Sequence, residues 1–428
     1  MDHKPACRGF LLRAVCFLLG ACLLFTGLSA LLNDKMSRKY AGDFYESGDP
    51  YEVLFFGSSH MFNGVLPLQL YRDTGVLSYN LGMTNEYPAV TYWRMVDALQ
   101  RCRPKVVVVV DVYRALSGEK MPRTESDLGL LHNSLDSMPL SLTKVRALAD
   151  ILDAGPGDFD GVFNYLFPLA QFHSRYRSLT EDDYHPYLME TRGAMPLRVW
   201  QPGTPLPLDR VPATDTAPLD SAPGETYLRR MMELCEAQGV PIVLVALPFQ
   251  APEDQLARLN GIAALAAEYP NAVYLNLLYE DVVDPLIDFS DPDGHLNTAG
   301  AARVTAWLGD WLTDRYPLTD RRGSAESWDR SLDNVRRQHC ATLAGAGDLT
   351  TALMLLAGQD LSFTLCAGPE AAAEPANAAL LARLGVPVTD GGVHWRSPGA
   401  PDIWPQSGAG LVAFDPDTGE ELARVELG

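Results

Sequence analysis

The chain lacks several patterns that would assign it to a familiar class of protein. Its seven cysteines form no CxxC pair and show no His/Cys spacing of the metal-binding kind, so no zinc site is expected. Four of them lie beyond residue 100 and could form disulfides, but the sequence does not show how they would pair: Cys102, Cys235, Cys340 and Cys366. Positive charge is scarce, because 34 Lys and Arg stand against 54 Asp and Glu, a net charge of −20. Such an acidic balance disfavours nucleic acid and anionic lipid as the main partner of the folded part.

Apolar residues, in contrast, are plentiful. They make up 47% of the 428 residues, whereas charged residues make up 21%. This composition is sufficient to fill a hydrophobic core, which excludes a disordered or fibrous chain. The length allows two or three domains, since a domain takes roughly 100–200 residues.

One long uncharged run lies near the N-terminus. It extends from Ala14 to Leu32 and, at about 1.5 Å per helical residue, nearly spans a hydrocarbon layer of roughly 30 Å. Residues 1–39 are therefore predicted to form a tail and a membrane anchor. Basic residues flank the run equally on both sides, so charge does not choose its orientation. Cleavage as a signal peptide and lipoprotein processing at Cys22 are the alternatives.

Apolar runs and helical patterns alternate through residues 40–320. Strands are predicted at Tyr51–Phe56, Leu77–Leu81, Lys105–Val112, Pro241–Leu247 and Ala272–Leu277, and helices at Tyr87–Cys102, Glu225–Gln238, Asp254–Glu268 and Thr298–Tyr316. The alternation predicts an α/β fold in which helices cover both faces of a parallel sheet. An insertion at 113–200, with helical pieces and few strand signals, and a proline-rich linker at 200–224 interrupt it.

The C-terminal region, residues 338–428, has a pattern of its own. Strand, helix and strand are predicted at Leu361–Cys366, Ala376–Leu384 and Gly410–Phe414, and DPDTG is a hairpin turn. The segments ALLARLGVP and GLVAFDPDTGEELARVEL faintly resemble the interleukin-like EMT-inducer fold. We therefore expect a small mixed α/β module with an accessory role in binding or packing.

Gly57-Ser58-Ser59-His60 is the first candidate catalytic segment. It directly follows the first predicted strand, at the edge where open α/β sheets bind ligands. A serine there is a candidate nucleophile, and adjacent N–H groups of the turn can face a developing oxyanion. The alternative is an ordinary strand-to-helix turn, in which serine caps the next helix.

The second candidate segment, DFSDPDGHLN at residues 288–297, precedes the last helix of the α/β region. Three carboxylates stand upstream of its histidine, His295: those of Asp288, Asp291 and Asp293. A histidine that acts as general base needs such a group to orient its ring. Turn chemistry with a helix cap at Asn297 is the alternative, and a calcium loop is disfavoured because its other positions are missing.

Taken together, FFGSSH, YNLGM and DPDGHLN resemble, in order, the first, second and last sequence blocks of the SGNH (GDSL-like) hydrolase family. The resemblance covers about residues 50–318, with gaps. It implies a flavodoxin-like parallel sheet that carries a Ser–His–Asp site and needs no metal or organic cofactor. It also implies Ser59 as nucleophile, His295 as base, and the N–H groups of Ser59 and Gly82 as oxyanion donors.

The oxyanion side of the site departs from the family pattern. The third block of the family normally supplies an asparagine after a strand, whereas here Asp111 follows the run VVVVV. Asn85 is the candidate that replaces this asparagine in space. His60 is expected to contact substrate or to pack locally rather than to serve as the base.

The acid of the triad also departs from the pattern. The family usually places it three residues before the histidine, and here that position is Pro292. Asp291 and Asp293 flank this proline. Asp291 is the preferred acid, because Asp293 is expected within the turn itself, and Asp293 is the alternative.

The segments LFFGSSHMFNGVLPLQLY, PKVVVVVDVY and GHLNTAGAARVT resemble the single-anchor SGNH proteins of bacterial envelopes. Many of these accompany membrane-bound O-acyltransferases, and D-alanyl transfer proteins are a related type. The resemblance implies a single-pass membrane protein with its catalytic domain outside the cytoplasm. It also implies a serine acyl esterase or O-acyltransferase that acts on an acylated envelope glycan or polymer, with a membrane-bound O-acyltransferase as partner.

Two other classes of function remain open. One is a non-catalytic subunit that presents a glycan or an acyl carrier to a membrane O-acyltransferase. The other is a plain binding or adhesion protein in which the serine segment is structural.

Overall fold

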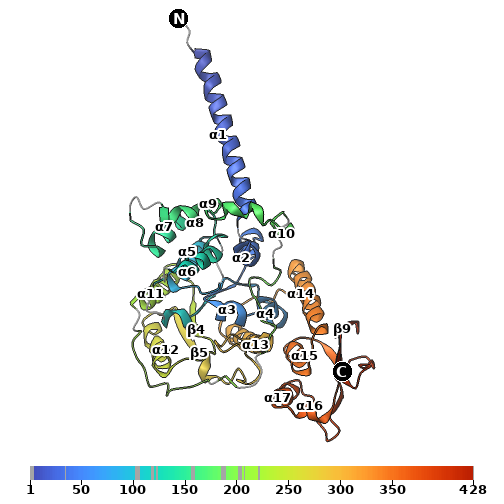
Figure 1. Cartoon of the computed structure of the whole chain (residues 1–428). Helices are drawn as coiled ribbons and strands as arrows, with labels where there is room; N and C mark the ends of the chain where they lie inside the picture. Colours follow the sequence, from blue (N-terminus) through green and yellow to red (C-terminus); the bar gives the residue numbers. More distant parts are fainter. Residues whose placement is uncertain are drawn as a thin grey trace.

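The computed structural model describes the chain apart from residues 1–3, 34, 102–106, 117–119, 122–123, 156–159, 185–188, 201–204, 207, 220–221 and 428. A long helix, α1 (Lys4–Leu32), projects from an α/β body, and a smaller C-terminal module lies beside that body (Figure 1). Within the described residues, Gly9–Leu32 is the one stretch of helix long and apolar enough to cross a membrane. The predicted apolar helix is thus confirmed, and its orientation stays a prediction.

The insertion fixes the point at which α1 leaves the body. Arg175, in the short helix η2 (His173–Arg177), donates hydrogen bonds to the carbonyl oxygens of Leu32, at 3.0 Å, and Asn33. The same guanidinium pairs with Asp183 of α10 (Glu181–Tyr184) at 2.8 Å. A cation at this position satisfies carbonyl groups that have no partner within the helix.

The body is built on five parallel strands in the order β2-β1-β3-β4-β5. They are β1 (Val53–Phe56), β2 (Ser78–Asn80), β3 (Val107–Asp111), β4 (Ile242–Ala246) and β5 (Ala272–Asn276). In this register Phe55 of β1, an interior strand, lies opposite Asn80 on one side and Val109 on the other. Every strand falls inside a predicted segment, so the predicted parallel sheet is confirmed.

Helices cover both faces of this sheet because successive strand side chains point to opposite sides. Leu54 and Phe56 pack into a core with α5 (Pro88–Arg101), α11 (Ala222–Ala237) and α12 (Glu253–Ala266). Val53 and Phe55 pack on the other face, where α3 (Ser59–Gly64) and α13 (Thr298–Arg315) supply the apolar side chains. The helix α4 (Pro67–Thr74) contributes to both cores.

The insertion is mainly helical as far as Tyr184, and its described residues 189–200 hold no helix. Its helices are α6 (Glu125–Leu135), α7 (Leu142–Ile151), α8 (Asp160–Leu166), α9 (Leu169–Phe172) and α10, and α2 (Met36–Glu46) joins α1 to the body. The described residues of the proline-rich linker run without helix or strand as far as the start of α11. They pack along the body, where the Leu206 N–H donates to the Pro285 carbonyl at 3.0 Å.

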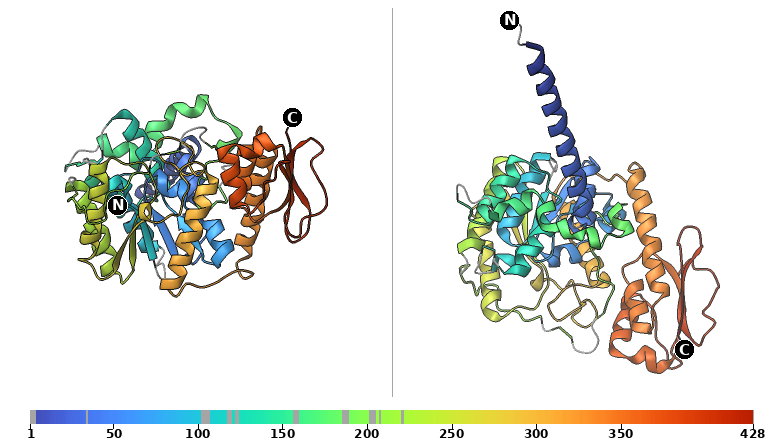
Figure 2. Two further views of the ribbon diagram at one scale, coloured as in Figure 1. Left: turned by 90° about the horizontal axis from the view of Figure 1, so that it is seen from below. Right: turned by 45° about the horizontal axis from the view of Figure 1, so that its top comes forward.

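The C-terminal module joins an antiparallel sheet, in the order β7-β6-β8-β9, to helices on one of its faces (Figure 2). The strands are β6 (Ser362–Ala367), β7 (Val393–Arg396), β8 (Ala409–Phe414) and β9 (Glu421–Leu427), and the helices are α14 (Glu326–Ala344), α15 (Leu349–Leu356), α16 (Pro369–Ala373) and α17 (Pro375–Arg383). Helix α14 belongs to both parts, because Trp328 is buried in the core of the body and Leu343 in the core of the module. Body and module therefore share a continuous interface.

The cysteines form no disulfide among the residues that the structure describes here. Cys235 and Cys340 are buried free thiols, and Cys366 is a partly buried one. Cys102 lies outside the described residues.

Candidate active site

Ser59 lies at the carboxyl end of β1, where the chain turns sharply into α3. The turn depends on Gly57, whose φ of +142° is one that residues with side chains rarely adopt. A Cβ at Gly57 would stand 2.7 Å from the Cβ of Asp111 at the end of β3. Because glycine has no Cβ, the turn after β1 can lie close to the end of β3. Ser58 then occupies the N-cap position of α3, and Ser59 occupies its first position.

His295 lies in the loop between the short helix η3 (Leu277–Tyr279) and α13. The side chain of Asn297 ends this loop by accepting hydrogen bonds from the N–H groups of Ala299 and Gly300, both at 3.0 Å. Such a cap begins the helix one residue later. The capped helix start thus sets the place of His295, two residues before the cap.

The structure brings Ser59, His295 and Asp291 into one chain of hydrogen bonds. Ser59 Oγ lies 2.8 Å from His295 Nε2, and His295 Nδ1 lies 2.8 Å from Asp291 Oδ2. The other carboxylate oxygen of Asp291 accepts from the backbone N–H groups of Asp293, at 3.0 Å, and His295, at 3.2 Å. The carboxylate is thereby held in one orientation by its own loop, with its Oδ2 facing the ring.

Partial burial suits this arrangement to proton transfer. The side chains of His295 and Asp291 are 18% and 34% exposed, so the imidazole is shielded while the site stays open to solvent. A serine hydroxyl bonded to an imidazole, which is in turn bonded to a carboxylate, has the relations of a nucleophile, its base and the group that orients the base.

His60 lies against His295 and forms a wall of the site. The two rings stack with centroids 4.7 Å apart, and the His60 ring also contacts Tyr113 and Phe249, at 4.3 and 5.7 Å. Burial, with a smaller contribution from His295, lowers the pKa of His60 to about 3. His60 is therefore neutral near pH 7, and its Nε2 lies 3.3 Å from the carbonyl oxygen of Asp293.

The expected oxyanion donors differ in their surroundings. The N–H of Ser59, at the start of α3, makes no hydrogen bond to the described residues. The N–H of Gly82 donates to Asn80 Oδ1 at 3.0 Å, and the amide of Asn85 donates to Asp127 in α6 at 2.9 Å. The Ser59 N–H is thus the free donor among the three in this structure.

Asp111 is the last residue of β3. It lies close in sequence to the position at which the family pattern has its asparagine. Burial raises the pKa of this carboxyl to about 7, against smaller lowering effects of hydrogen bonds that include those from Tyr113 N–H and Ser58 Oγ. The Ser58 hydroxyl donates to Asp111 Oδ2 at 3.4 Å. The sequence shows only that the asparagine is missing here, and no local pattern in it indicates a buried carboxyl with so high a pKa.

Asp288, the third carboxylate of the loop, has a different role. It is fully buried and forms a two-pronged ion pair with Arg383 of α17, in which Nη2 lies 3.0 Å from Oδ2 and Nη1 contacts Oδ1. Its backbone carbonyl accepts from the N–H of Asn297 at 2.9 Å. The sequence carried no signal for this pair, because its members are distant along the chain.

Asp291, Asp293 and His295 are close enough to be considered as metal ligands. One ligand atom from each lies within 4.8 Å of the others. In the structure, however, His295 Nδ1 and the Asp291 carboxylate are hydrogen-bonded to each other. Two of the three candidate ligands thus already use donor atoms within the triad.

Comparison with known proteins adds little. No protein-family model matches the chain, and no curated protein matches it. A solved structure described as "a putative platelet activating factor from Streptococcus pneumonia" is similar, with 12% identity over 68% of this chain and 98% of that chain and a TM-score of 0.32. A similarity of this size carries no argument about the fold or activity of this chain.

Proposed function

We propose that the chain is a membrane-anchored serine acyl esterase or O-acyltransferase of the SGNH type. The observation that carries the proposal is the hydrogen-bonded series Ser59–His295–Asp291, with both contacts at 2.8 Å. Its position at the carboxyl edge of a parallel sheet supports the same reading, since such sheets bind ligands there.

In the proposed reaction, Ser59 Oγ attacks the acyl carbonyl carbon of an ester while His295 Nε2 takes the hydroxyl proton. His295 then returns the proton to the leaving alcohol oxygen as the ester bond breaks, which leaves the acyl group on Ser59. Water, or the hydroxyl of an acceptor, attacks this acyl-enzyme in the second half of the reaction. Asp291 holds the tautomer with hydrogen on Nδ1 and stabilises the imidazolium.

The surroundings of the triad support this division of roles. The unbonded N–H of Ser59 is placed on the attacked residue itself, where an oxyanion donor is needed. The stacked, neutral ring of His60 adds no second positive charge beside His295. An imidazolium formed during turnover is therefore opposed by one partner, the carboxylate of Asp291.

The substrate and the location rest on the sequence resemblance. We propose that the body lies outside the cytoplasm, anchored through α1, and acts on an acylated envelope glycan or polymer, beside a membrane-bound O-acyltransferase. The length and apolar surface of α1 are what a single-pass anchor requires.

Labelling with a serine-reactive fluorophosphonate, together with hydrolysis of a small acetyl ester, tests the proposal. Ser59→Ala is expected to abolish labelling and to lower turnover by about 10³-fold or more. Ser58→Ala is the matched control, because it removes the neighbouring hydroxyl and should lower turnover much less. Equal labelling of the unaltered chain and of Ser59→Ala would rule out Ser59 as the nucleophile.

A non-catalytic accessory subunit is the second candidate. It is favoured by one observation, the hydrogen bond that occupies the Gly82 N–H and leaves the oxyanion position with the Ser59 donor alone. This candidate predicts a chain that binds an acylated glycan but neither reacts with the fluorophosphonate nor hydrolyses the acetyl ester.

A further inference from the structure

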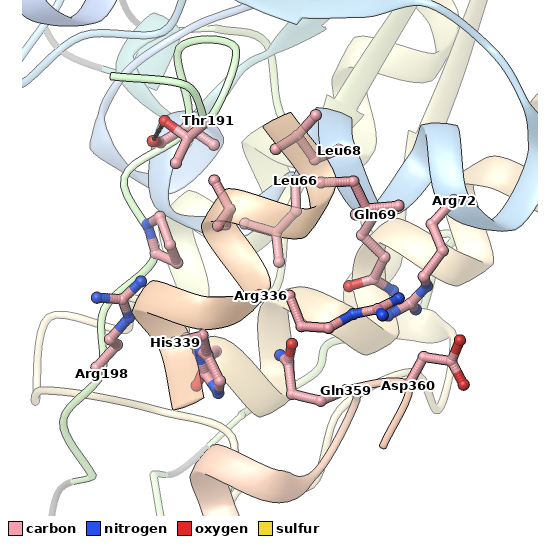
Figure 3. A pocket seen from close by; sticks show the side chains of 15 residues that line it. Leu66, Leu68, Gln69, Arg72, Thr191, Arg198, Arg336, His339, Gln359 and Asp360 are labelled. Atoms are coloured by element: carbon pink, nitrogen blue, oxygen red, sulfur yellow. Dashed lines mark hydrogen bonds between the residues drawn. The ribbon is translucent and has the colours of Figure 1, made fainter. Parts of the chain in front are cut away.

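A cavity between the body and the C-terminal module lies apart from the triad. It is bounded by the start of α4, by the chain around Pro196 and by one side of α14, and none of the triad residues lines it (Figure 3). Its volume is about 80 Å³. Since one water needs about 10–15 Å³ by this measure, roughly six non-hydrogen atoms fit.

The cavity contains a cation without a matching anion. Arg198 is half-buried, and within the described chain no carboxylate lies within ion-pair distance of it. Its Nη1 donates to Thr342 Oγ1 at 3.3 Å, whereas its buried Nε has no partner. Burial lowers the pKa of Arg198 from its ordinary value, as expected for a charge that loses water without gaining a counter-charge.

None of the other charged groups in the described lining of the cavity forms an ion pair with Arg198. Arg336 pairs with Asp415 at 2.8 Å, and Arg72 pairs with Asp73 at 2.7 Å. The exposed Asp360 lies at the opposite side of the cavity from Arg198 (Figure 3). An anion that entered beside Arg198 would thus meet a guanidinium that has no counter-charge among the described residues.

His339 adds a neutral polar wall next to this guanidinium. Its Nε2 lies 2.7 Å from the carbonyl oxygen of Leu355, so Nε2 carries the hydrogen, and its side chain is buried. Burial and the nearby Arg198 lower the pKa of His339 to about 4. This ring therefore brings no second positive charge, and Arg198 alone would carry the recognition of an anion.

Apart from the charged groups, His339 and the uncharged polar side chains of Gln69, Thr191, Thr298 and Gln359, the lining is apolar. It includes Leu66, Leu68, Ala194, Pro196, Leu332 and Val335. We propose that this cavity binds a short-chain organic carboxylate, with the carboxylate on Arg198 and the hydrocarbon against the apolar wall. A planar carboxylate matches the fork of a guanidinium, and the apolar wall would reward burial of hydrocarbon, which inorganic anions lack.

Binding of butanoate to the full chain in lipid nanodiscs, measured by ligand-observed NMR, tests this site. The Ser59→Ala chain is used, so that the result does not depend on the proposed catalysis. We expect butanoate to bind at least about 10-fold more tightly than butan-1-ol, which has the same hydrocarbon without the charge. Empty nanodiscs give the background from the lipid.

Variants of Arg198 complete the test. Arg198→Gln should weaken butanoate binding by about 10-fold or more, because it removes the charged hydrogen bonds. Arg337→Gln removes an exposed charge from α14, a helix that lines the cavity, and should leave butanoate binding unchanged. Arg198→Lys, which keeps the charge, should retain part of the affinity and serves if the Gln variant does not fold.

Three outcomes would overturn the proposal. They are equal affinity for butanoate and butan-1-ol in the unaltered cavity, butanoate binding that survives Arg198→Gln, and binding of inorganic phosphate without binding of butanoate.

Discussion

At the scale of single residues, Asp291 illustrates how a short loop can orient a carboxylate. It accepts three hydrogen bonds, two from backbone N–H groups of its own loop and one from the His295 ring. Asp293 contributes its backbone to this network, through an N–H to Asp291 and a carbonyl oxygen near His60. The two neighbouring acids thus have separate tasks.

Replacing each acid in turn tests this separation. Asp291→Asn should lower ester turnover by about 10⁴-fold, because the amide favours the wrong tautomer of His295. Asp293→Asn should retain most activity, since only its backbone takes part. Turnover of both variants is measured on the same acetyl ester. An inactive Asp293→Asn together with an active Asp291→Asn would show that Asp293, not Asp291, is the acid of the triad.

Asp111 is a buried carboxyl whose ionisation opposes folding. Its pKa in the folded chain is about 7, above a value of about 3.9 when unfolded. Between these values the folded chain binds more protons than the unfolded chain, so the contribution of Asp111 to stability is present at low pH and is lost as pH rises through about 7.

Asp111→Asn should remove this pH dependence. The free energy of unfolding of the variant, minus that of the unaltered chain, should increase by about 2–4 kcal/mol between pH 4 and pH 8. Denaturant unfolding in detergent at both pH values measures the difference. Asp333→Asn, at an exposed site on α14, is the control and should show no such trend, while a flat difference for Asp111→Asn would contradict the argument.

At the scale of elements, the turn from β1 into α3 is the feature on which the site depends. It brings Ser59 to the sheet edge and requires close approach to the end of β3. Gly57 and Gly48 both have positive φ, +142° and +65°, but only Gly57 has a neighbour within 4 Å of the position of a Cβ. Substitution of both glycines by alanine therefore distinguishes the effect of backbone strain, which both variants share, from that of steric contact, which only Gly57→Ala has.

Gly57→Ala should destabilise the chain more than Gly48→Ala. Both variants strain the backbone, but the first also forces a methyl group to within 2.7 Å of Asp111 Cβ. We expect the loss of unfolding free energy to be at least about 1 kcal/mol larger for Gly57→Ala. Denaturant unfolding of the two variants gives the comparison, and equal losses would mean that the turn relaxes without cost.

At the scale of the whole molecule, the C-terminal module supports the loop that carries His295. Ile287 and Ala299, which flank that loop, are buried in the core of the module, and the Thr298 hydroxyl lies 3.2 Å from Met354 Sδ. The ion pair of Asp288 with Arg383 adds a charged link at the same place. The module is thus part of the framework of the candidate site.

Arg383→Gln should show the strength of this link. It leaves the buried Asp288 carboxylate without its main partner, so we expect a loss of about 3–5 kcal/mol in unfolding free energy and a lower ester turnover. Adding Asp288→Asn should restore part of the stability, because it removes the unpaired charge. Arg396→Gln, at a 49% exposed site in the same module, should have little effect; equal losses for the two arginines would refute the proposed support.

The side of the membrane on which the body of the proposed anchored protein lies is the remaining prediction at this scale. A cysteine introduced at Ala213, in an exposed part of the linker, should react with a membrane-impermeant maleimide in intact cells. The unaltered chain is the control for its native cysteines. Labelling that occurs only after lysis would place the body in the cytoplasm and remove the envelope substrate.

The apolar N-terminal helix, the five strands of the body and its helices α5, α11, α12 and α13 could be predicted from the sequence. Each depends on local properties, a run of uncharged residues or a periodic apolar face, which the chain displays within about 5–20 residues. The candidate residues Ser59 and His295 could also be identified from the sequence, because Ser59 follows a recognisable strand and His295 precedes a recognisable helix. Only the tertiary structure places their side chains in contact across 236 positions of sequence.

Other features were decided by tertiary structure alone. The engagement of the Gly82 N–H by Asn80, the high pKa of Asp111 and the pairing of Asp288 with Arg383 all depend on groups that meet only after folding. Helix α14 likewise begins before residue 338, where the C-terminal module was expected to start, and its Trp328 is buried in the core of the body. Local patterns determine where elements form, whereas burial and long-range pairing determine what each polar group in the site is able to do.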